Sequence, residues 1–190
     1  MSENDVIKLP EVVVFAGPNG SGKTTITSMA KIAGEYINAD DIKRTTFCSD
    51  LEAAVKAEEL REKMISEKKD FTFETVLSTD RNLNLLKKAK EQGYFVRGYF
   101  ILTANVDVNI ARVNVRVHSG GHGVPEDKII SRYRKSLDRV PELVNICDIL
   151  HVYDNTSDKA FRIFKKRKDV FFKWSNEFWS DEEIDKLCGI

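Results

Sequence analysis

Short apolar runs alternate with longer amphipathic segments along most of the chain. The runs are rich in β-branched and aromatic side chains, which is typical of buried strands. They occupy residues 11–16, 35–39, 71–75, 94–102 and 148–153. The segments between them, at about 23–33, 51–68, 80–92, 106–118 and 125–139, have the periodicity or the terminal residues of helices. This order predicts βαβ units, and therefore an α/β fold with a mainly parallel, five-stranded sheet flanked by helices.

The helix expected at 51–68 carries a distinct apolar stripe. Ala53, Ala57, Leu60 and Met64 recur at intervals of three and four residues, so they lie on one face. We expect this face to pack on the sheet.

The pattern changes after residue 158, where "AFRIF" and "VFFKW" flank the turn "KKRKD". These runs predict a C-terminal β-hairpin, which a short capped helix follows, so that hairpin and helix span 159–190. Phe172 and Trp174 alternate as residues of a buried face do. The basic turn and the aromatic residues are also compatible with nucleic-acid binding. Lysines commonly protect edge strands from pairing, so we expect no nucleic-acid partner. We treat residues 1–190 as a single domain.

Composition narrows the class of protein. Thirty basic and thirty acidic residues cancel, so no overall field attracts nucleic acid or an anionic membrane. The three cysteines are far apart and form neither a metal-binding pattern nor a disulfide framework. The polar start "MSENDVIKLPE" is unlike a signal peptide, and no apolar run is long enough to cross a bilayer. A cytoplasmic protein without a membrane partner is expected.

The stretch "GPNGSGKTT", residues 17–25, follows the first strand and precedes the first helix, as a phosphate-binding loop must. Its glycines allow the backbone N–H groups to surround a phosphate, and the helix N-terminus adds partial positive charge. Lys23 can reach the β- and γ-phosphates, and the Thr24 hydroxyl can ligate Mg²⁺. The sequence therefore predicts a nucleoside triphosphate site formed by Gly17, Pro18, Asn19, Gly20, Ser21, Gly22, Lys23, Thr24 and Thr25, with Thr24 as metal ligand.

Two acidic residues follow neighbouring strands. Asp40 comes just after the second strand, and Glu74 lies at the end of the third, beside Thr75. Since active sites of such sheets form at the carboxyl ends of the strands, these residues are candidates for contact with the phosphate acceptor. Asp40 could act as the catalytic base, and Glu74 could orient the acceptor or the waters of Mg²⁺. The alternative is helix capping, which we assign to Asp41 before a helix that begins at Ile42.

A basic helical pair at about 112–139 predicts a lid. Arg112 and Arg116 are four residues apart and share a helix face, and Arg132 lies on the next helix. The connecting "SGGHG", which includes His122, can act as a hinge. Closing such a lid would bring cations over the γ-phosphate and exclude water. The alternative is a solvated helical hairpin with surface ion pairs.

Four motifs together, "AGPNGSGKTT", "INADDIK", "FETVLST" and "RVHSGGHGVPEDKIISRY…VYDNT", resemble the zeta-toxin-like P-loop kinases over residues 11–157. The resemblance implies ATP–Mg²⁺ as phosphate donor and a UDP-amino sugar such as UDP-N-acetylglucosamine as acceptor. It implies Asp40 as catalytic base, Lys23 as the phosphate-loop lysine and Glu74 as an acceptor contact. Arg112 or Arg116 matches the first lid arginine, and the second falls near His122 or Arg132.

Three hypotheses follow. The first is a small-molecule kinase with Lys23, Asp40 and Arg116 as catalytic residues, Arg112 as a nucleotide contact, and Glu74, Thr75, His122 and Arg132 as further acceptor contacts. The second is an ATPase or nucleotide switch that acts through a protein or nucleic-acid partner. The third is a toxin kinase whose antitoxin covers the ATP site.

Overall fold

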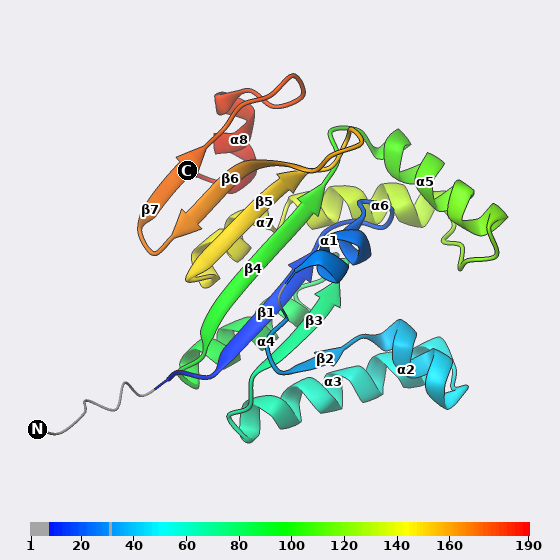
Figure 1. The fold of residues 1–190 in the computed structure, drawn as a ribbon, viewed down its shortest axis with the longest axis vertical. Helices are drawn as coiled ribbons and strands as arrows, with labels where there is room; N and C mark the ends of the chain where they lie inside the picture. The colour runs from blue at the N-terminus through cyan, green and yellow to red at the C-terminus, as the bar shows by residue number, and fades with distance from the viewer. Residues whose placement is uncertain (1–7, 31) are drawn as a thin grey trace, which may run out of the picture.

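A seven-stranded sheet forms the centre of the computed structural model, which describes residues 8–30 and 32–190 (Figure 1). The strand order is β2-β3-β1-β4-β5-β6-β7. The first five of these strands are parallel, and β6 and β7 are antiparallel additions. The strands are β1 (Glu11–Ala16), β2 (Glu35–Ile37), β3 (Phe71–Thr75), β4 (Phe95–Leu102), β5 (Ile149–Asp154), β6 (Phe161–Arg167) and β7 (Val170–Lys173). The expected P-loop α/β class is confirmed, but the hairpin extends the sheet from five strands to seven.

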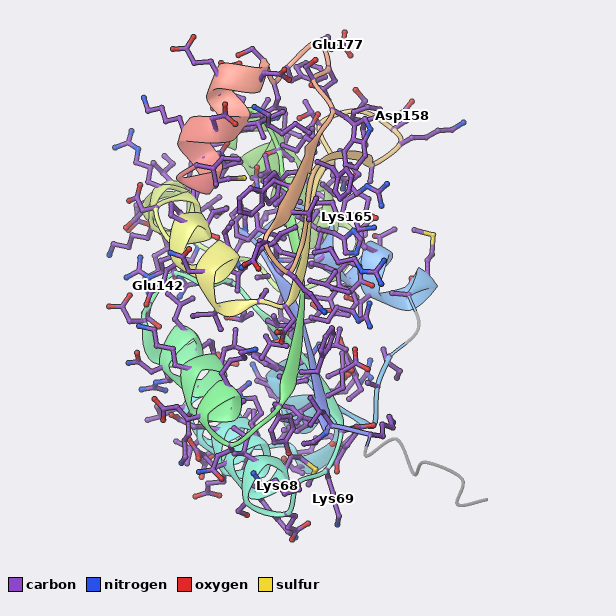
Figure 2. All side chains as sticks on the ribbon, turned by 90° about the vertical axis from the view of Figure 1, so that its left-hand side faces the viewer. Lys68, Lys69, Glu142, Asp158, Lys165 and Glu177 are labelled. Atoms are coloured by element: carbon purple, nitrogen blue, oxygen red, sulfur yellow. The ribbon has the colours of Figure 1, made fainter. Side chains whose placement is uncertain are left out.

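The helices cover the two faces of the sheet unequally. They are α1 (Lys23–Met29), α2 (Ala39–Thr46), α3 (Asp50–Ser66), α4 (Arg81–Glu91), α5 (Val106–His118), α6 (Glu126–Leu137), α7 (Val140–Ile146) and α8 (Asp181–Cys188). Residues of α3, α4, α7 and α8 join the large apolar core on one face, and Figure 2 shows α4, α7 and α8 on that side. On the other face α1 packs over a small cluster of Val13, Phe15 and Ile101. No described helix is both long enough and apolar enough to span a membrane.

The C-terminal hairpin differs from the expectation in its burial. Phe172 and Trp174 are 44 % and 36 % exposed, so the expectation of a buried face is wrong. The Lys165 ammonium lies over the Phe172 ring, and the Arg162 guanidinium lies 4.6 Å from the centre of the Trp174 ring. The two aromatic residues do share one face of the hairpin. Helix α8 covers the opposite face, where Asp185 of α8 pairs with Lys173.

The start of α2 also differs from the expectation. The helix begins at Ala39, and its N-cap is Asn38, whose Oδ1 accepts a hydrogen bond of 2.9 Å from the Asp40 N–H. The expected cap, Asp41, lies inside the first turn and pairs with Arg44 at 2.8 Å. Because the cap comes three residues earlier, β2 ends at Ile37. Asp40 therefore projects from the first turn of a helix, next to the sheet edge.

Two further helix boundaries were missed. The first helix stops at Met29 rather than near residue 33, because Ala30 has an extended backbone. A short helix, α7, follows directly after Arg139 with Pro141 in its first turn. No element was expected from the sequence at these residues.

The topology determines where a ligand can bind. β1 lies between β3 and β4, and the order of the strands reverses at this point. In open α/β sheets a crevice forms at such a reversal, beyond the carboxyl ends of the strands. The phosphate-binding loop follows β1 there, and Glu74 lies near the end of the neighbouring β3.

We expect Tyr94→Phe to destabilise the fold by about 1–3 kcal/mol, since the Lys69 carbonyl would lose its hydroxyl partner and the Met64 carbonyl would keep only the Lys69 N–H. The single proton of the Tyr94 hydroxyl is shared between the Met64 and Lys69 carbonyl oxygens, which lie 2.7 and 2.9 Å away, and so holds the end of α3 on the sheet. Urea unfolding measures the change. Tyr153→Phe is the control, because no hydrogen bond of its hydroxyl occurs in the described residues; equal effects of both variants would contradict this account.

Candidate active site

The phosphate-binding loop packs tightly against its neighbours. Gly17 and Gly22 have φ angles of 142° and 89°, which disfavour any residue with a Cβ. A Cβ at Gly17 would lie 1.9 Å from the Ile101 carbonyl oxygen, and one at Gly22 would lie 2.3 Å from the Asn155 side-chain nitrogen. Backbone conformation and the β4 carbonyl thus require glycine at position 17, whereas at position 22 backbone conformation favours glycine and the Asn155 side chain would have to move for any other residue.

Two asparagines outside the loop hold its backbone. Asn109 of α5 donates to the Asn19 carbonyl at 2.6 Å, and Asn155 donates to the Ser21 carbonyl at 2.8 Å. Sequence reasoning missed both, because their contacts join segments about ninety or more residues apart. The loop is therefore connected directly to the base of α5 and to the segment after β5.

Lys23 begins α1 and reaches back over the loop. Its ammonium donates to the carbonyls of Gly17 and Pro18 at 2.7 and 2.9 Å. Burial lowers its pKa to about 8; Arg116 acts in the same direction, whereas Glu74 and Asp40 oppose it. An incoming phosphate would favour the charged form of this lysine.

Glu74 is held by two hydroxyl groups. Its Oε1 accepts a hydrogen bond of 2.8 Å from Tyr36, and its Oε2 accepts one of 3.2 Å from Thr24. The Tyr36 oxygen in turn accepts from the Asn38 amide at 3.1 Å. Burial raises the pKa of Tyr36, so its phenol stays protonated and remains a donor. One chain of hydrogen bonds therefore links the phosphate loop to the N-cap of α2.

Tyr36 was missed in the sequence because its contact with Glu74 depends on the register of two strands. It pairs with Thr72 on the neighbouring strand, and Glu74 lies two residues beyond Thr72. Residues two apart in a strand point to the same face, so Tyr36 and Glu74 were bound to be diagonal neighbours.

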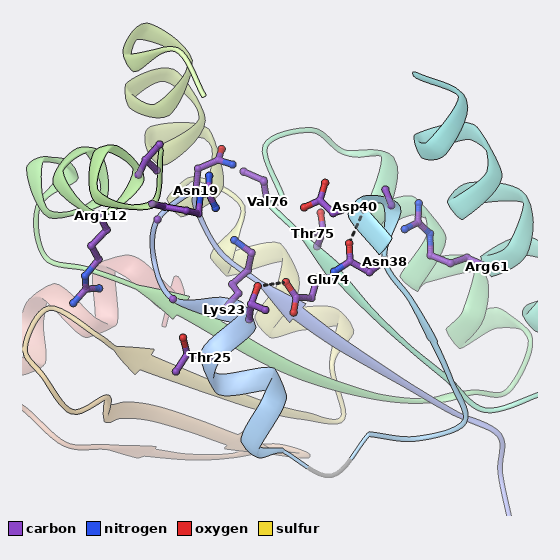
Figure 3. A pocket seen from close by; sticks show the side chains of 16 residues that line it. Asn19, Lys23, Thr25, Asn38, Asp40, Arg61, Glu74, Thr75, Val76 and Arg112 are labelled. Carbon is purple, nitrogen blue, oxygen red and sulfur yellow. Dashed lines mark hydrogen bonds between the residues drawn. The ribbon is translucent and has the colours of Figure 1, made fainter. Parts of the chain in front are cut away.

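Asp40 faces the same cavity from the other side. Within the described residues its carboxylate has no hydrogen bond and no ion pair, although its backbone N–H is capped by Asn38. Figure 3 shows Asp40 near Asn38 and Thr75, across the cavity from Lys23. A carboxylate with free acceptor capacity at this position is able to take a proton.

The cavity that contains these groups has a volume of about 580 Å³ (Figure 3). It extends from the phosphate loop to α2 and α3. It is lined by Asn19, Gly20, Gly22, Lys23, Thr24, Thr25, Asn38, Ala39, Asp40, Arg61, Glu74, Thr75, Val76, Arg112, Val113 and Arg116. The expected nucleotide-side and acceptor-side residues thus largely share one cavity.

The oxygen donors in this cavity suit Mg²⁺. Thr24 Oγ1 and Glu74 Oε2 are 3.2 Å apart, and both are hard ligands of the kind that Mg²⁺ prefers. The described residues contain no group of three or more His, Cys, Asp or Glu side chains that could hold a metal. A magnesium ion here would depend on few protein ligands and on the phosphates, as is usual for nucleotide-bound Mg²⁺.

The basic helical pair contributes to the cavity through α5 alone. Arg112 and Arg116 line it, and Arg112 also donates to the Asn155 and Thr156 carbonyls at 2.7 and 3.3 Å. Arg132 of α6 is absent from the lining of this cavity. His122 is absent as well; its Nε2 lies 3.2 Å from the Lys43 ammonium of α2.

The expected hinge is partly a helix cap. The Gly120 N–H bonds to the Val117 carbonyl and the Gly121 N–H to the Arg116 carbonyl, both at 2.9 Å. With a φ of 83° at Gly120, this is a Schellman motif that ends α5. The stretch that joins the two helices without such bonds is thereby reduced to about residues 122–125.

Comparison with known proteins agrees with this geometry. The family model for zeta toxins matches residues 3–169 of the 190 residues. The chain belongs to the zeta toxin family. It is 33 % identical to an uncharacterised protein of Haemophilus influenzae over 129 residues, which are 65 % of this chain and 92 % of that protein.

Two solved structures share the fold at low identity. A chain of the PezAT chromosomal toxin–antitoxin system of Streptococcus pneumoniae has a TM-score of 0.63 and 17 % identity, over 95 % of this chain and 84 % of that one. The complex of AvrRxo1-ORF1 and AvrRxo1-ORF2 with ATP has a TM-score of 0.72 and 14 % identity, over 94 % of this chain and 63 % of that one. Family and fold together confirm the expected enzyme class, a P-loop kinase.

We expect the affinity for ADP–Mg²⁺ to fall by roughly tenfold between pH 8 and about pH 9.5. Lys23, with a pKa lowered to about 8, loses its proton over this interval and with it its attraction for phosphate. Calorimetry at several pH values measures the affinity. Lys23→Arg is the control, since its guanidinium stays charged and its affinity should be flat. A flat profile for the wild-type protein would contradict the lowered pKa.

We also expect Tyr36→Phe to slow phosphoryl transfer by about tenfold and to leave ADP affinity nearly unchanged, because one hydrogen bond to the Glu74 carboxylate is lost. Steady-state rates and calorimetry give the two quantities. Equal losses of rate and of nucleotide affinity would assign Tyr36 to the nucleotide side instead.

Proposed function

We propose that this protein transfers the γ-phosphate of ATP–Mg²⁺ to a hydroxyl group of a small acceptor. The observation that carries the proposal is the cavity that joins the phosphate loop to Asp40, whose carboxylate has no hydrogen-bond or ion-pair partner among residues 8–30 and 32–190. A hydrolase or a nucleotide switch has no need of acceptor space in the same cavity beside the phosphates. A kinase needs room for an acceptor as well as a base.

The nucleotide side of the proposal rests on the loop, 17–25, and on cations around it. Its backbone N–H groups and Lys23 would bind the phosphates, and Thr24 would ligate Mg²⁺ next to Glu74. When bound, Mg²⁺ neutralises phosphate charge as a Lewis acid. Arg112, tied to the carbonyls after β5, would position the nucleotide, and Arg116 would stabilise charge on the transferred group.

On the acceptor side, Asp40 would take the proton of the attacking hydroxyl. The acceptor oxygen forms a bond to the γ-phosphorus while the bond to the β–γ bridging oxygen breaks, and ADP leaves. Glu74, held by Thr24 and Tyr36, and Thr75 would orient the acceptor. His122 and Arg132 would join only after movement of the α5–α6 pair, although His122 already reaches Lys43 of α2.

The resemblance to zeta toxins supports a UDP-amino sugar, such as UDP-N-acetylglucosamine, as the acceptor. A structural relative is part of a toxin–antitoxin system by name, which supports a protein inhibitor as a partner of this chain. If so, expression of the active protein alone should arrest bacterial growth.

Asp40→Asn should lower the rate of transfer at least about a hundredfold, since a general base contributes that much or more. ADP–Mg²⁺ affinity should change little. Wild type and variant are compared in a screen of sugar nucleotides, nucleosides and other phosphorylatable metabolites, with ADP release and product mass followed together.

Asp41→Asn is the matched control, because Asp41 has the same chemistry but pairs with Arg44 and does not line the cavity. Full transfer by Asp40→Asn would remove Asp40 from the mechanism. ADP release that no acceptor stimulates would favour an ATPase or switch that acts through a macromolecular partner.

A further inference from the structure

Arg61 of α3 is a buried cation that forms no ion pair with the described residues. The residue is 8 % exposed, and its Nε is buried with no hydrogen-bond partner. Across residues 8–30 and 32–190 its guanidinium makes no ion pair. An arginine enclosed in this way is costly unless something compensates its charge.

The carboxylates near Arg61 are already engaged with other cations. Glu58, one turn before it on α3, pairs with Arg81 at 3.1 Å. Glu62, the next residue, pairs with Lys88. Burial is the main cause that lowers the pKa of Arg61, which Glu58 and Glu62 only partly oppose. The positive charge is therefore available to a ligand.

The guanidinium is held in place by stacking. It lies over the ring of Phe73 on β3, 5.1 Å from the ring centre. Such an arrangement satisfies one face of the guanidinium and leaves its N–H edges for a planar or tetrahedral anion. Figure 3 shows Arg61 projecting from α3 toward the Asn38 and Asp40 side of the active cavity.

A second chamber opens at this point. It has a volume of about 450 Å³ and shares Ala39, Arg61, Thr75 and Val76 with the active cavity. Asn82 also lines it; its Nδ2 donates to Thr75 Oγ1 at 2.8 Å, while its Oδ1 is buried without a partner. The buried Arg61 and the half-buried Asn82, whose Oδ1 is buried, thus border the same space with unused hydrogen-bonding capacity.

We propose that Arg61 forms an anion-binding subsite for the acceptor, so that the acceptor carries a phosphate or carboxylate group close to the hydroxyl that is phosphorylated. The proposal rests on the proposed kinase function, with Asp40 at the hydroxyl and Arg61 at the anion. Asn82 would contribute a further hydrogen bond. A neutral acceptor would leave the buried cation uncompensated, and the site would therefore discriminate against it.

Binding in the presence of saturating ADP–Mg²⁺ tests the subsite without requiring turnover. The probes are N-acetylglucosamine 1-phosphate, glucuronate and neutral N-acetylglucosamine, titrated by calorimetry. We expect at least one of the anions to bind about tenfold or more tightly than the neutral sugar, and the preferred one identifies the group that Arg61 recognises. Arg61→Met should abolish that preference, and Arg61→Lys should keep part of it.

Arg134→Met is the control, because Arg134 is an exposed arginine of α6 outside the cavities. It should retain the preference, and ADP affinity should be equal in all variants. Phosphoryl transfer is measured separately. Binding of the anion through Arg61 without any phosphoryl transfer would contradict the kinase function but not the anion-binding subsite.

A second measurement separates recognition from a structural role. If the role of Arg61 is to bind a ligand, the ligand-free Arg61→Met variant should resist urea unfolding as well as the wild-type protein or better. The reason is that an apolar side chain replaces an uncompensated buried charge. Marked destabilisation of the ligand-free protein would show a structural role and overturn the proposal. So would equal binding of anionic and neutral probes, or no binding of either anion at millimolar concentration.

Discussion

The close packing of the phosphate loop is the constraint on which the rest of the site depends. The loop is shaped from outside as much as by its own glycines: β4 approaches Gly17, α5 approaches Gly20, and the segment after β5 approaches Gly22. Hydrogen bonds from Asn109 and Asn155 reinforce two of these contacts. Any displacement of these neighbours would therefore reach the phosphate-binding N–H groups directly, which couples the sheet and the base of the lid to nucleotide binding.

Charge is distributed along the cavity in a way that suits transfer between two molecules. Cations surround the loop, Glu74 is fixed by two hydroxyls in the middle, and Asp40 and Arg61 lie beyond it, both without partners in the described residues. Side chains with unsatisfied hydrogen-bonding capacity reduce the stability of the fold, and proteins commonly retain them where a ligand supplies the missing partner. The two unpartnered groups are of opposite charge, which fits an acceptor that offers both a hydroxyl proton and an anion.

Local features of the sequence were sufficient to predict the loop that forms the proposed nucleotide side of the cavity. The loop, its strand and its helix are contiguous, so 17–25 could be read directly. The acceptor half depends on packing between distant elements. Arg61 was passed over because Leu60 was assigned to the apolar stripe of α3, whereas the buried series runs through Ala57, Arg61 and Ile65. The cap of α2 was misassigned because "NADD" offers several capping residues, and only the end of β2 selects Asn38. The hairpin's exposed aromatic residues could not be foreseen, since alternation does not reveal which face a helix covers.

The destination of the γ-phosphate in a single turnover tests the central claim most directly. Protein in excess over γ-labelled ATP–Mg²⁺ is mixed with candidate hydroxyl compounds, and the labelled species are separated. The account predicts that the label moves to the hydroxyl of one small acceptor, with ADP formed in equal amount and no labelled protein. Label that appears only as inorganic phosphate, or on the protein itself, would contradict a direct transfer from the loop to an acceptor beside Asp40.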